Sequence, residues 1–324
     1  MLTSTGKTNP QGSTGAMPSL SVVTSVYQSE RFLAPFIDEM VAAIEKTGIA
    51  NYELIFVNDG SPDESLFCLM RARANNPHIK IVDLSRNFGH HKAVLAGLSY
   101  AKSDLTFIID CDLEVRPNVL QRFLDTLRST DVDVVYGVQE MRKGALVERT
   151  GGALFWRLFN TLSATKIPEN VLSERLMKRS YVQALLSLGD RNVFLGGMMY
   201  WSGFRQLGIV IEKTQREGPS TYSFRKRLSL LLEAVTSFST APLKLVLLVG
   251  LGVTLLAMMA AGALLVRKLL HPEAVLQGFT SLMLVTIGMG GIVITVLGVV
   301  GLYIARIYTQ TQNRPLFIVR EFHD

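Results

Sequence analysis

The sequence predicts an α/β protein with a Rossmann-like, mostly parallel sheet, followed by an interfacial helix region and two C-terminal transmembrane helices. Three observations lead to this prediction. From residue 20 onward, short apolar runs alternate with stretches of helical periodicity; acidic residues follow two of these runs; and two long runs near the C-terminus carry no charge. Strands that alternate with helices of about 10–15 residues are typical of parallel sheets.

Five strands and four helices are expected in the first half of the chain. The strands are placed at 20–26, 52–57, 79–84, 105–109 and 132–136, and the helices at 31–46, 64–75, 92–101 and 119–128. A cluster of turn-forming residues, 58–62, ends the second strand. The domain is expected to span 19–212. Residues 1–18, rich in Ser, Thr, Gly and Pro, are expected to form a disordered leader.

The apolar character of the chain is concentrated near its C-terminus. Of the 324 residues, 48% are apolar and 19% charged, the mean hydropathy is +0.27 and the formal net charge is +6. This composition excludes collagen, a disordered chain and a disulfide scaffold. Only two cysteines, Cys68 and Cys111, are present, which favours a reducing compartment.

Residues 243–307 are predicted to contain two membrane spans. The uncharged run 245–266 would extend about 33 Å as a helix, against a hydrocarbon core of about 30 Å. A second uncharged run covers 274–305. Buried helices of a soluble core rarely run so long without a polar break. Seven basic residues flank the pair and two lie between the runs, which predicts a multi-pass protein of the inner (plasma) membrane, with the domain and the 308–324 tail in the cytoplasm.

Two carboxylates form the candidate metal site. The glycine-rich phosphate cradles of dinucleotide-binding domains and P-loops are missing, so phosphate charge must be handled in another way. Asp110 and Asp112 flank Cys111 directly after an apolar strand and would lie on the same side of an extended segment. Mg²⁺ is commonly held by one or two carboxylates together with substrate phosphates. An isolated Asp-x-Asp is usually a solvated turn, but the strand context favours a Mg²⁺ or Mn²⁺ site.

Several spaced motifs resemble the inverting family-2 glycosyltransferases of GT-A fold. The resemblance is strongest to bactoprenol glucosyltransferases and the undecaprenyl-phosphate aminoarabinose transferase. It rests on residues 22–25, 57–63, 84–89, 109–113, 218–223, 236–243 and 301–308, and so covers about 19–320. The resemblance implies a nucleotide-sugar donor, with a UDP-sugar favoured, a polyprenyl phosphate acceptor, and a homo-oligomer, often a tetramer.

The resemblance also assigns roles to residues of the donor site. Asp59 would contact the nucleotide base or ribose, and Arg86 would shape the donor pocket. Asp110 would lie near the nucleotide. Asp112, the principal catalytic residue, would hold the metal against the diphosphate.

The chain departs from the family pattern at three places. Relatives usually read Asp-Ala-Asp-Leu-Gln-Asp or similar where residues 110–115 read Asp-Cys-Asp-Leu-Glu-Val, a change that keeps the candidate metal ligands. Relatives often carry Asp-Phe-Arg-Leu where residues 173–176 read Ser-Glu-Arg-Leu, and that aspartate is a candidate catalytic base. Ser173 cannot replace it, which leaves Glu174 as the candidate. Gln215 and Thr221 also replace a usual arginine and lysine. A lipid phosphate is already anionic at neutral pH, so the loss of a base suits a phosphate acceptor better than a sugar hydroxyl.

A basic juxtamembrane segment, 213–242, is expected to form interfacial helices. Arg216, Arg225, Lys226 and Arg227 are candidate ligands of the acceptor phosphate. The alternative is a positive-inside signal combined with attraction to anionic lipid. Nucleic acid is not an expected partner, because the basic residues adjoin a membrane anchor.

The predicted function is metal-dependent, inverting transfer of a sugar to undecaprenyl phosphate on the cytoplasmic membrane face, for O-antigen or another envelope glycan. Two alternatives stay open. One is a transferase whose acceptor is a lipid-linked sugar, and the other is a catalytically degenerate membrane scaffold. Ser173, Gln215 and Thr221 motivate the scaffold, whereas the intact aspartates favour an enzyme.

Overall fold

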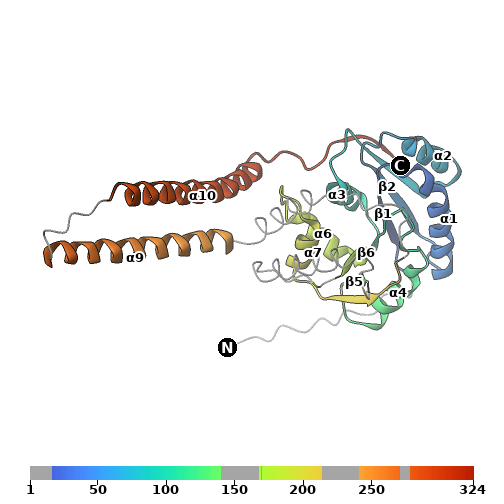
Figure 1. Cartoon of the computed structure of the whole chain (residues 1–324). Helices are drawn as coiled ribbons and strands as arrows, with labels where there is room; N and C mark the ends of the chain where they lie inside the picture. The colour runs from blue at the N-terminus through green and yellow to red at the C-terminus, as the bar shows by residue number, and fades with distance from the viewer. Residues whose placement is uncertain (1–16, 140–167, 169, 214–240, 271–277) are drawn as a thin grey trace, which may run out of the picture.

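The computed structural model describes residues 17–139, 168, 170–213, 241–270 and 278–324. Within them, the chain forms one mixed eight-stranded sheet with the order β7-β5-β6-β4-β1-β2-β3-β8. Helices cover both faces of the sheet, and two long helices extend away from it (Figure 1). Residues 1–16 of the predicted leader and most of the predicted interfacial region lie outside the described residues.

The strands and helices of the first half of the chain agree with the sequence prediction to within two residues. The strands are β1 (Leu20–Val26), β2 (Tyr52–Asn58), β3 (Ile79–Leu84), β4 (Leu105–Ile108), β5 (Val134–Val138), β6 (Val171–Lys178), β7 (Gln206–Val210) and β8 (Val319–His323). The helices are α1 (Glu30–Thr47), α2 (Ser65–Asn75), α3 (His90–Tyr100), α4 (Val119–Ser129), α6 (Arg179–Ser187), α7 (Leu195–Trp201), α9 (Ala241–Leu270) and α10 (Phe279–Thr311).

The expectation of a mostly parallel sheet holds for four of the seven strand pairings among the described residues. Strands β4, β1, β2 and β3 are parallel neighbours, and β5 pairs with β7 in parallel. The other three pairings, β3 with β8, β4 with β6 and β5 with β6, are antiparallel. The sheet is therefore mixed. Strand β6 escaped prediction because its central residues Ser173, Glu174 and Arg175 break the apolar alternation that marks a strand.

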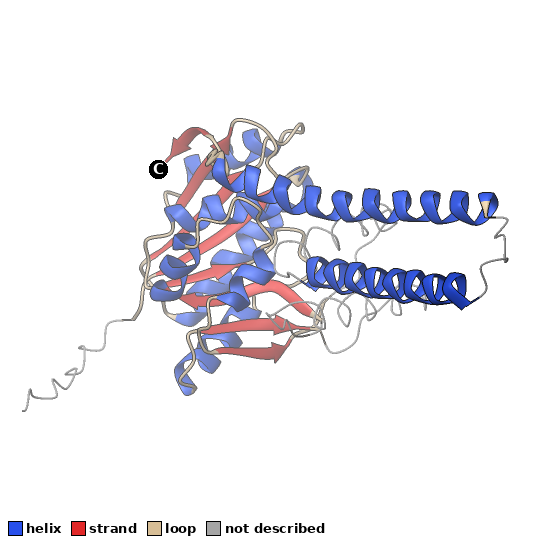
Figure 2. Cartoon of the chain, turned by 90° about the vertical axis from the view of Figure 1, so that its left-hand side faces the viewer, coloured by secondary structure: helices blue, strands red, loops and turns tan. Residues whose placement is uncertain are grey.

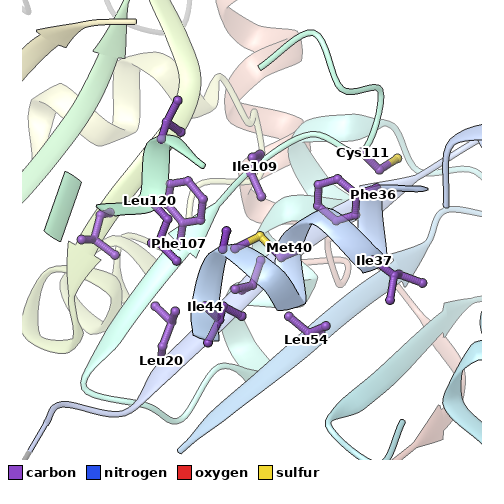
Figure 3. Packing of buried hydrophobic residues seen from close by; sticks show 14 of the residues in the cluster. Leu20, Phe36, Ile37, Met40, Ile44, Leu54, Phe107, Ile109, Cys111 and Leu120 are labelled. Carbon is purple, nitrogen blue, oxygen red and sulfur yellow. The ribbon is translucent and has the colours of Figure 1, made fainter. Parts of the chain in front are cut away.

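Two apolar layers hold the helices against the sheet. One layer joins α1, α2 and α4 to one face and contains Phe36, Phe107 and Phe123 (Figure 3). The other layer joins α3, α6 and α7 to the opposite face. Both faces of the central strands are thus buried, which explains why their sequences are mostly apolar and do not strictly alternate between apolar and polar residues.

Helices α9 and α10 lie side by side and project from the sheet domain (Figures 1 and 2). Within α10, the stretch Gly288–Thr311 is long and apolar enough to cross a membrane, with a mean hydropathy of 2.1 and none of the tested window buried. A shorter apolar stretch, Leu243–Val253, lies in α9. The run 245–266 and residues 279–305 of the second run are therefore helical, and one helix among the described residues is long and apolar enough for a membrane span.

After α10 the chain returns to the sheet. The end of α10 contacts the loop before α7: Arg306 Nη1 donates to Asn192 Oδ1 at 3.0 Å, and the backbone amide of Arg191 donates to Gln310 Oε1 at 2.9 Å. Val319–His323 then pairs with β3 as the edge strand β8, so the C-terminus lies at the sheet edge (Figure 2). The predicted tail, 308–324, therefore contributes a strand to the domain.

Candidate active site

The predicted acidic residues meet at one edge of the sheet. Asp59 follows β2, Arg86 follows β3, and Asp110 and Asp112 follow β4. These strands are parallel and contiguous through β1, so their carboxyl ends share an edge. Ligands of open α/β sheets bind outside this edge.

Asp110 and Asp112 lie on either side of a buried thiol. Cys111 is 4% exposed and packs into the core, and burial raises the pKa of its thiol to about 12. Leu113 has a left-handed backbone, with φ of 59°, and this turn brings the amide of Glu114 to 3.1 Å from Oδ1 of Asp112. A positive φ is uncommon for a leucine, and such residues concentrate at functional sites.

Strand β6 brings two further residues to the acidic pair. Because β6 is antiparallel to β4, the beginning of β6 lies at the carboxyl end of β4. Ser173 Oγ donates a 2.8 Å hydrogen bond to Oδ2 of Asp110. Glu174 is 4% exposed, and within the described residues its Oε2 has no hydrogen-bond partner. Burial, reinforced by the charge of Asp110, raises the pKa of Glu174 to about 7.

Lys213 supplies positive charge to this cluster. It follows β7, whose carboxyl end lies at the same edge of the sheet, and its Nζ is 2.6 Å from Oε2 of Glu114. Burial, the largest single effect, lowers the pKa of Lys213, but the hydrogen bond to Glu114 and the charges of Glu114, Glu174 and Asp112 together outweigh it, so the pKa is raised overall. Burial also raises the pKa of Asp112, with the carboxylates of Glu114 and Asp110 adding to the effect. The site therefore favours a bound cation.

Asp59 holds the loop that follows β3. It is 2% exposed, and its two oxygens accept hydrogen bonds from the backbone amides of Phe88 at 2.7 Å and Gly89 at 2.9 Å. Burial raises the pKa of Asp59 against the lowering effect of these bonds. A direct contact between Asp59 and a nucleotide stays a prediction.

Arg86 is exposed at the same edge of the sheet. Its guanidinium lies 4.2 Å from the centre of the Phe88 ring, and its charge opposes the rise in the pKa of Asp59. Gly60 has φ of 60°, and a Cβ at this position would lie 2.5 Å from the backbone of Arg86 and Asn87. The loops 58–63 and 85–89 are therefore in direct backbone contact, which only glycine at position 60 permits.

Residues 21–186 match the model of glycosyl transferase family 2. The chain belongs to this family. It is 33% identical to the glycosyltransferase YkcC of Bacillus subtilis, over 93% of each chain. It is 30% identical to the SfII prophage-derived bactoprenol glucosyl transferase of Shigella flexneri, over 94% of this chain and 98% of that protein. These matches confirm the predicted family and the prediction of an enzyme, a glycosyltransferase.

The comparison with solved structures also finds glycosyltransferases. The mannosyltransferase PcManGT of Pyrobaculum calidifontis, solved in complex with GDP-Man and Mn²⁺, is 16% identical. Its alignment covers 92% of this chain and 88% of that one, with a TM-score of 0.48.

The carboxylates of this glycosyltransferase fit a hard divalent cation. Among the described residues, no group of three or more His, Cys, Asp or Glu side chains could enclose a metal ion. Asp110 and Asp112 nevertheless offer two carboxylates at the edge where a donor would bind. Such a pair suits Mg²⁺, which keeps several waters and takes further ligands from substrate phosphates.

Four predicted residues of the glycosyltransferase cannot be placed. Arg216, Arg225, Lys226 and Arg227, the candidate ligands of the acceptor phosphate, lie outside the described residues.

A cavity of about 350 Å³ opens at the opposite, amino-terminal edge of the sheet, beside Tyr52 and His78. None of the predicted site residues lines this cavity.

Three side-chain contacts at or near the candidate site escaped the sequence analysis. Ser173 bonds to Asp110, Lys213 to Glu114, and Arg320 of β8 to Asp83. One indication of Lys213 was present in the sequence, since it is the first residue of the basic segment. The pairing with Glu114 could not be found because 99 positions separate the two residues along the chain.

Proposed function

We propose that this glycosyltransferase moves a sugar, with inversion, from a nucleotide-sugar to undecaprenyl phosphate at the cytoplasmic face of the plasma membrane. A UDP-sugar is the favoured donor. The observation that carries the proposal is the position of Asp110 and Asp112 at the donor edge of a chain that also contains a membrane-length helix. The 30% identity to bactoprenol glucosyl transferases along almost the whole chain supports the lipid acceptor.

Donor activation falls to the carboxylates at the end of β4. Asp112 and Asp110 would hold Mg²⁺ or Mn²⁺, which supplies positive charge to stabilise the departing diphosphate. Ser173 keeps Asp110 oriented through its hydrogen bond. Lys213 adds a fixed positive charge beside Asp112 and Glu114.

The acceptor side needs no strong base. The phosphate oxygen of a lipid phosphate is already anionic at neutral pH, so no proton has to leave during attack. Glu174, the candidate base, is 4% exposed and has a pKa raised to about 7. It is therefore partly protonated at neutral pH, which suits a group that exchanges a proton better than a metal ligand. Arg216, Arg225, Lys226 and Arg227 are proposed to bind the acceptor phosphate.

The membrane topology is proposed to be two spans, α9 and α10, with both termini cytoplasmic. The pairing of β8 with β3 supports this topology, because a chain that leaves the domain and returns to it must cross the membrane an even number of times. A homo-oligomer, a tetramer by family resemblance, and a product used for O-antigen or another envelope glycan complete the proposal.

The test uses the full-length protein in detergent with undecaprenyl phosphate and either Mg²⁺ or Mn²⁺. A panel of UDP-, GDP- and dTDP-sugars is offered, and nucleotide release and lipid-linked sugar are measured. One donor is expected to give a lipid-linked product that disappears with EDTA and in Asp112→Asn. Asp104→Asn, at the opposite end of β4, is the matched control and is expected to stay active.

Other results of this assay would contradict the proposal. One contrary result is nucleotide release without a sugar-linked lipid phosphate. If a lipid-linked sugar, added as acceptor, then gives a glycosylated product, the alternative acceptor is identified. No turnover and no donor binding with any sugar would favour a scaffold. In a separate genetic test, full complementation of a knockout strain by Asp112→Asn would also favour a scaffold.

A further inference from the structure

The last strand of the chain reaches the loop that follows β3. Within β8, Arg320 Nη1 lies 3.3 Å from Oδ2 of Asp83, and Nη2 donates to the backbone carbonyl of Ser85 at 2.8 Å. The carbonyl of Ile318 accepts a hydrogen bond from the Ser85 amide at 2.9 Å. Residues from beyond the membrane helices therefore hold both backbone groups of Ser85, the first residue of the 85–89 loop.

Asp83 connects Arg320 to the neighbouring loop, 58–63. It is 3% exposed, and its Oδ1 accepts a 2.7 Å hydrogen bond from Nδ2 of Asn58. Oδ1 of Asn58 in turn accepts from the Ser61 amide at 3.3 Å. Asn58 is itself 3% exposed, so the path from Arg320 to the 58–63 loop runs through buried groups with defined partners.

The same two loops are joined at their tips. Asp59 accepts from the amides of Phe88 and Gly89, and Gly60 contacts the backbone of Arg86. A shift of either loop is therefore transmitted to the other. Together the loops form the part of the donor edge contributed by β2 and β3.

We propose that Arg320 is a positioning residue for the donor loops 58–63 and 85–89, and that it thereby sets the affinity for the nucleotide-sugar. This inference rests on the proposed function. Without Arg320, the buried carboxylate of Asp83 keeps, among the described residues, only the side-chain amide of Asn58, and Ser85 loses the side-chain donor to its carbonyl. A buried carboxylate that loses a charged partner must reorganise or admit water, and either change displaces the loops.

The alternative is that Arg320 only stabilises the sheet edge, and the experiment must separate the two. Donor KM and kcat are measured for the full-length wild type, Arg320→Ala, Arg320→Lys and the matched control Glu321→Gln. Glu321 is the neighbouring residue of the same strand, exposed, and its ion-pair contact is with His323 at 3.7 Å. Hydrogen–deuterium exchange of the same four proteins reports loop order without any activity.

The expected result is a rise in donor KM of about tenfold in Arg320→Ala, with kcat changed less than about threefold. Faster exchange is expected at 58–63 and 85–89, with α1 and α4 unchanged. The donor KM of Arg320→Lys is expected to lie between those of the wild type and Arg320→Ala, because one ammonium cannot contact both the Asp83 carboxylate and the Ser85 carbonyl. Glu321→Gln is expected to match the wild type.

An unchanged donor KM in Arg320→Ala, or a fall in kcat alone, would overturn the inference. If Arg320→Ala fails to fold, Arg320→Gln, which removes the charge but keeps a long polar side chain, is measured in its place, and a wild-type donor KM with wild-type loop exchange in that variant refutes positioning. If the wild type turns over no donor, the proposed function fails separately, and the exchange data still test whether Arg320 orders the two loops.

Discussion

The hydroxyl of Ser173 lies 2.8 Å from Oδ2 of Asp110 and joins the beginning of β6 to the end of β4. A neutral donor therefore occupies the place beside Asp110 where the family resemblance leads one to expect a second carboxylate. Asp110 gains a hydrogen bond instead of a repulsive neighbour. A serine at position 173, where relatives often carry an aspartate, is thus electrostatically compatible with Asp110 and Asp112, the acidic pair that the proposed metal requires.

Replacing Ser173 by aspartate should make the site more dependent on a cation. Two carboxylates in contact repel each other, so Ser173→Asp is expected to lower the metal-free stability by about 1–3 kcal/mol. Bound Mn²⁺ relieves this repulsion, so the rise in Tm on adding Mn²⁺ should exceed that of the wild type. Thermal melts in EDTA and in Mn²⁺ measure both effects. Ser173→Asn is the neutral control, and equal stability of the two variants in EDTA would contradict the expectation.

Glu174 distinguishes the two classes of acceptor. If the acceptor is a lipid phosphate, Glu174→Gln should retain transfer to within about tenfold, because no proton is removed from an anionic oxygen. If the acceptor is a sugar hydroxyl that uses Glu174 as its base, the loss should be about 10²–10⁴-fold. Initial rates with saturating donor decide between them. Asp112→Asn, measured in parallel, gives the rate of a disabled site.

Asp59 is expected to be needed for loop order. Its two oxygens each accept a backbone amide, and the NH₂ group of an asparagine cannot accept a hydrogen bond. Asp59→Asn should therefore leave one partly buried amide unsatisfied and cost about 1–3 kcal/mol of stability. Denaturation, together with amide exchange at Phe88 and Gly89, tests this. Wild-type protection of both amides in the variant would show that Asp59 does not hold the loop.

Protonation of the buried His91 side chain is expected to lower the stability of the protein in mild acid. Burial, with a smaller contribution from the charge of His90, lowers the pKa of His91 from 6.5 to about 4. The unfolded chain then binds more protons than the folded chain between these values, so stability falls as the pH drops from about 6.5 to 4. The loss is up to about 3 kcal/mol. His91→Gln should flatten this part of the stability–pH curve, measured by denaturation from pH 4 to 8. An unchanged slope would show that His91 is not responsible.

The sequence was sufficient for the central parallel strands and for the metal-binding candidates. The segments that form β1 to β4 are predominantly apolar because both faces of the sheet are covered, and such segments can be recognised without any knowledge of their partners. Asp110 and Asp112 were identified for the same local reason: they directly follow one of these runs. Family membership was likewise carried by motifs that are each short in sequence.

Tertiary structure alone decided which residues complete the site. Ser173 reaches Asp110 across 63 positions, and Arg320 reaches Asp83 across 237, because antiparallel strands from distant segments pair at the edges of the parallel centre. Asp59 is buried with both oxygens engaged, although its sequence position is equally compatible with an exposed ligand. Local sequence records the tendency to form a strand, but strand pairing depends on the burial and hydrogen bonding of the whole sheet, so these contacts had to be found in three dimensions.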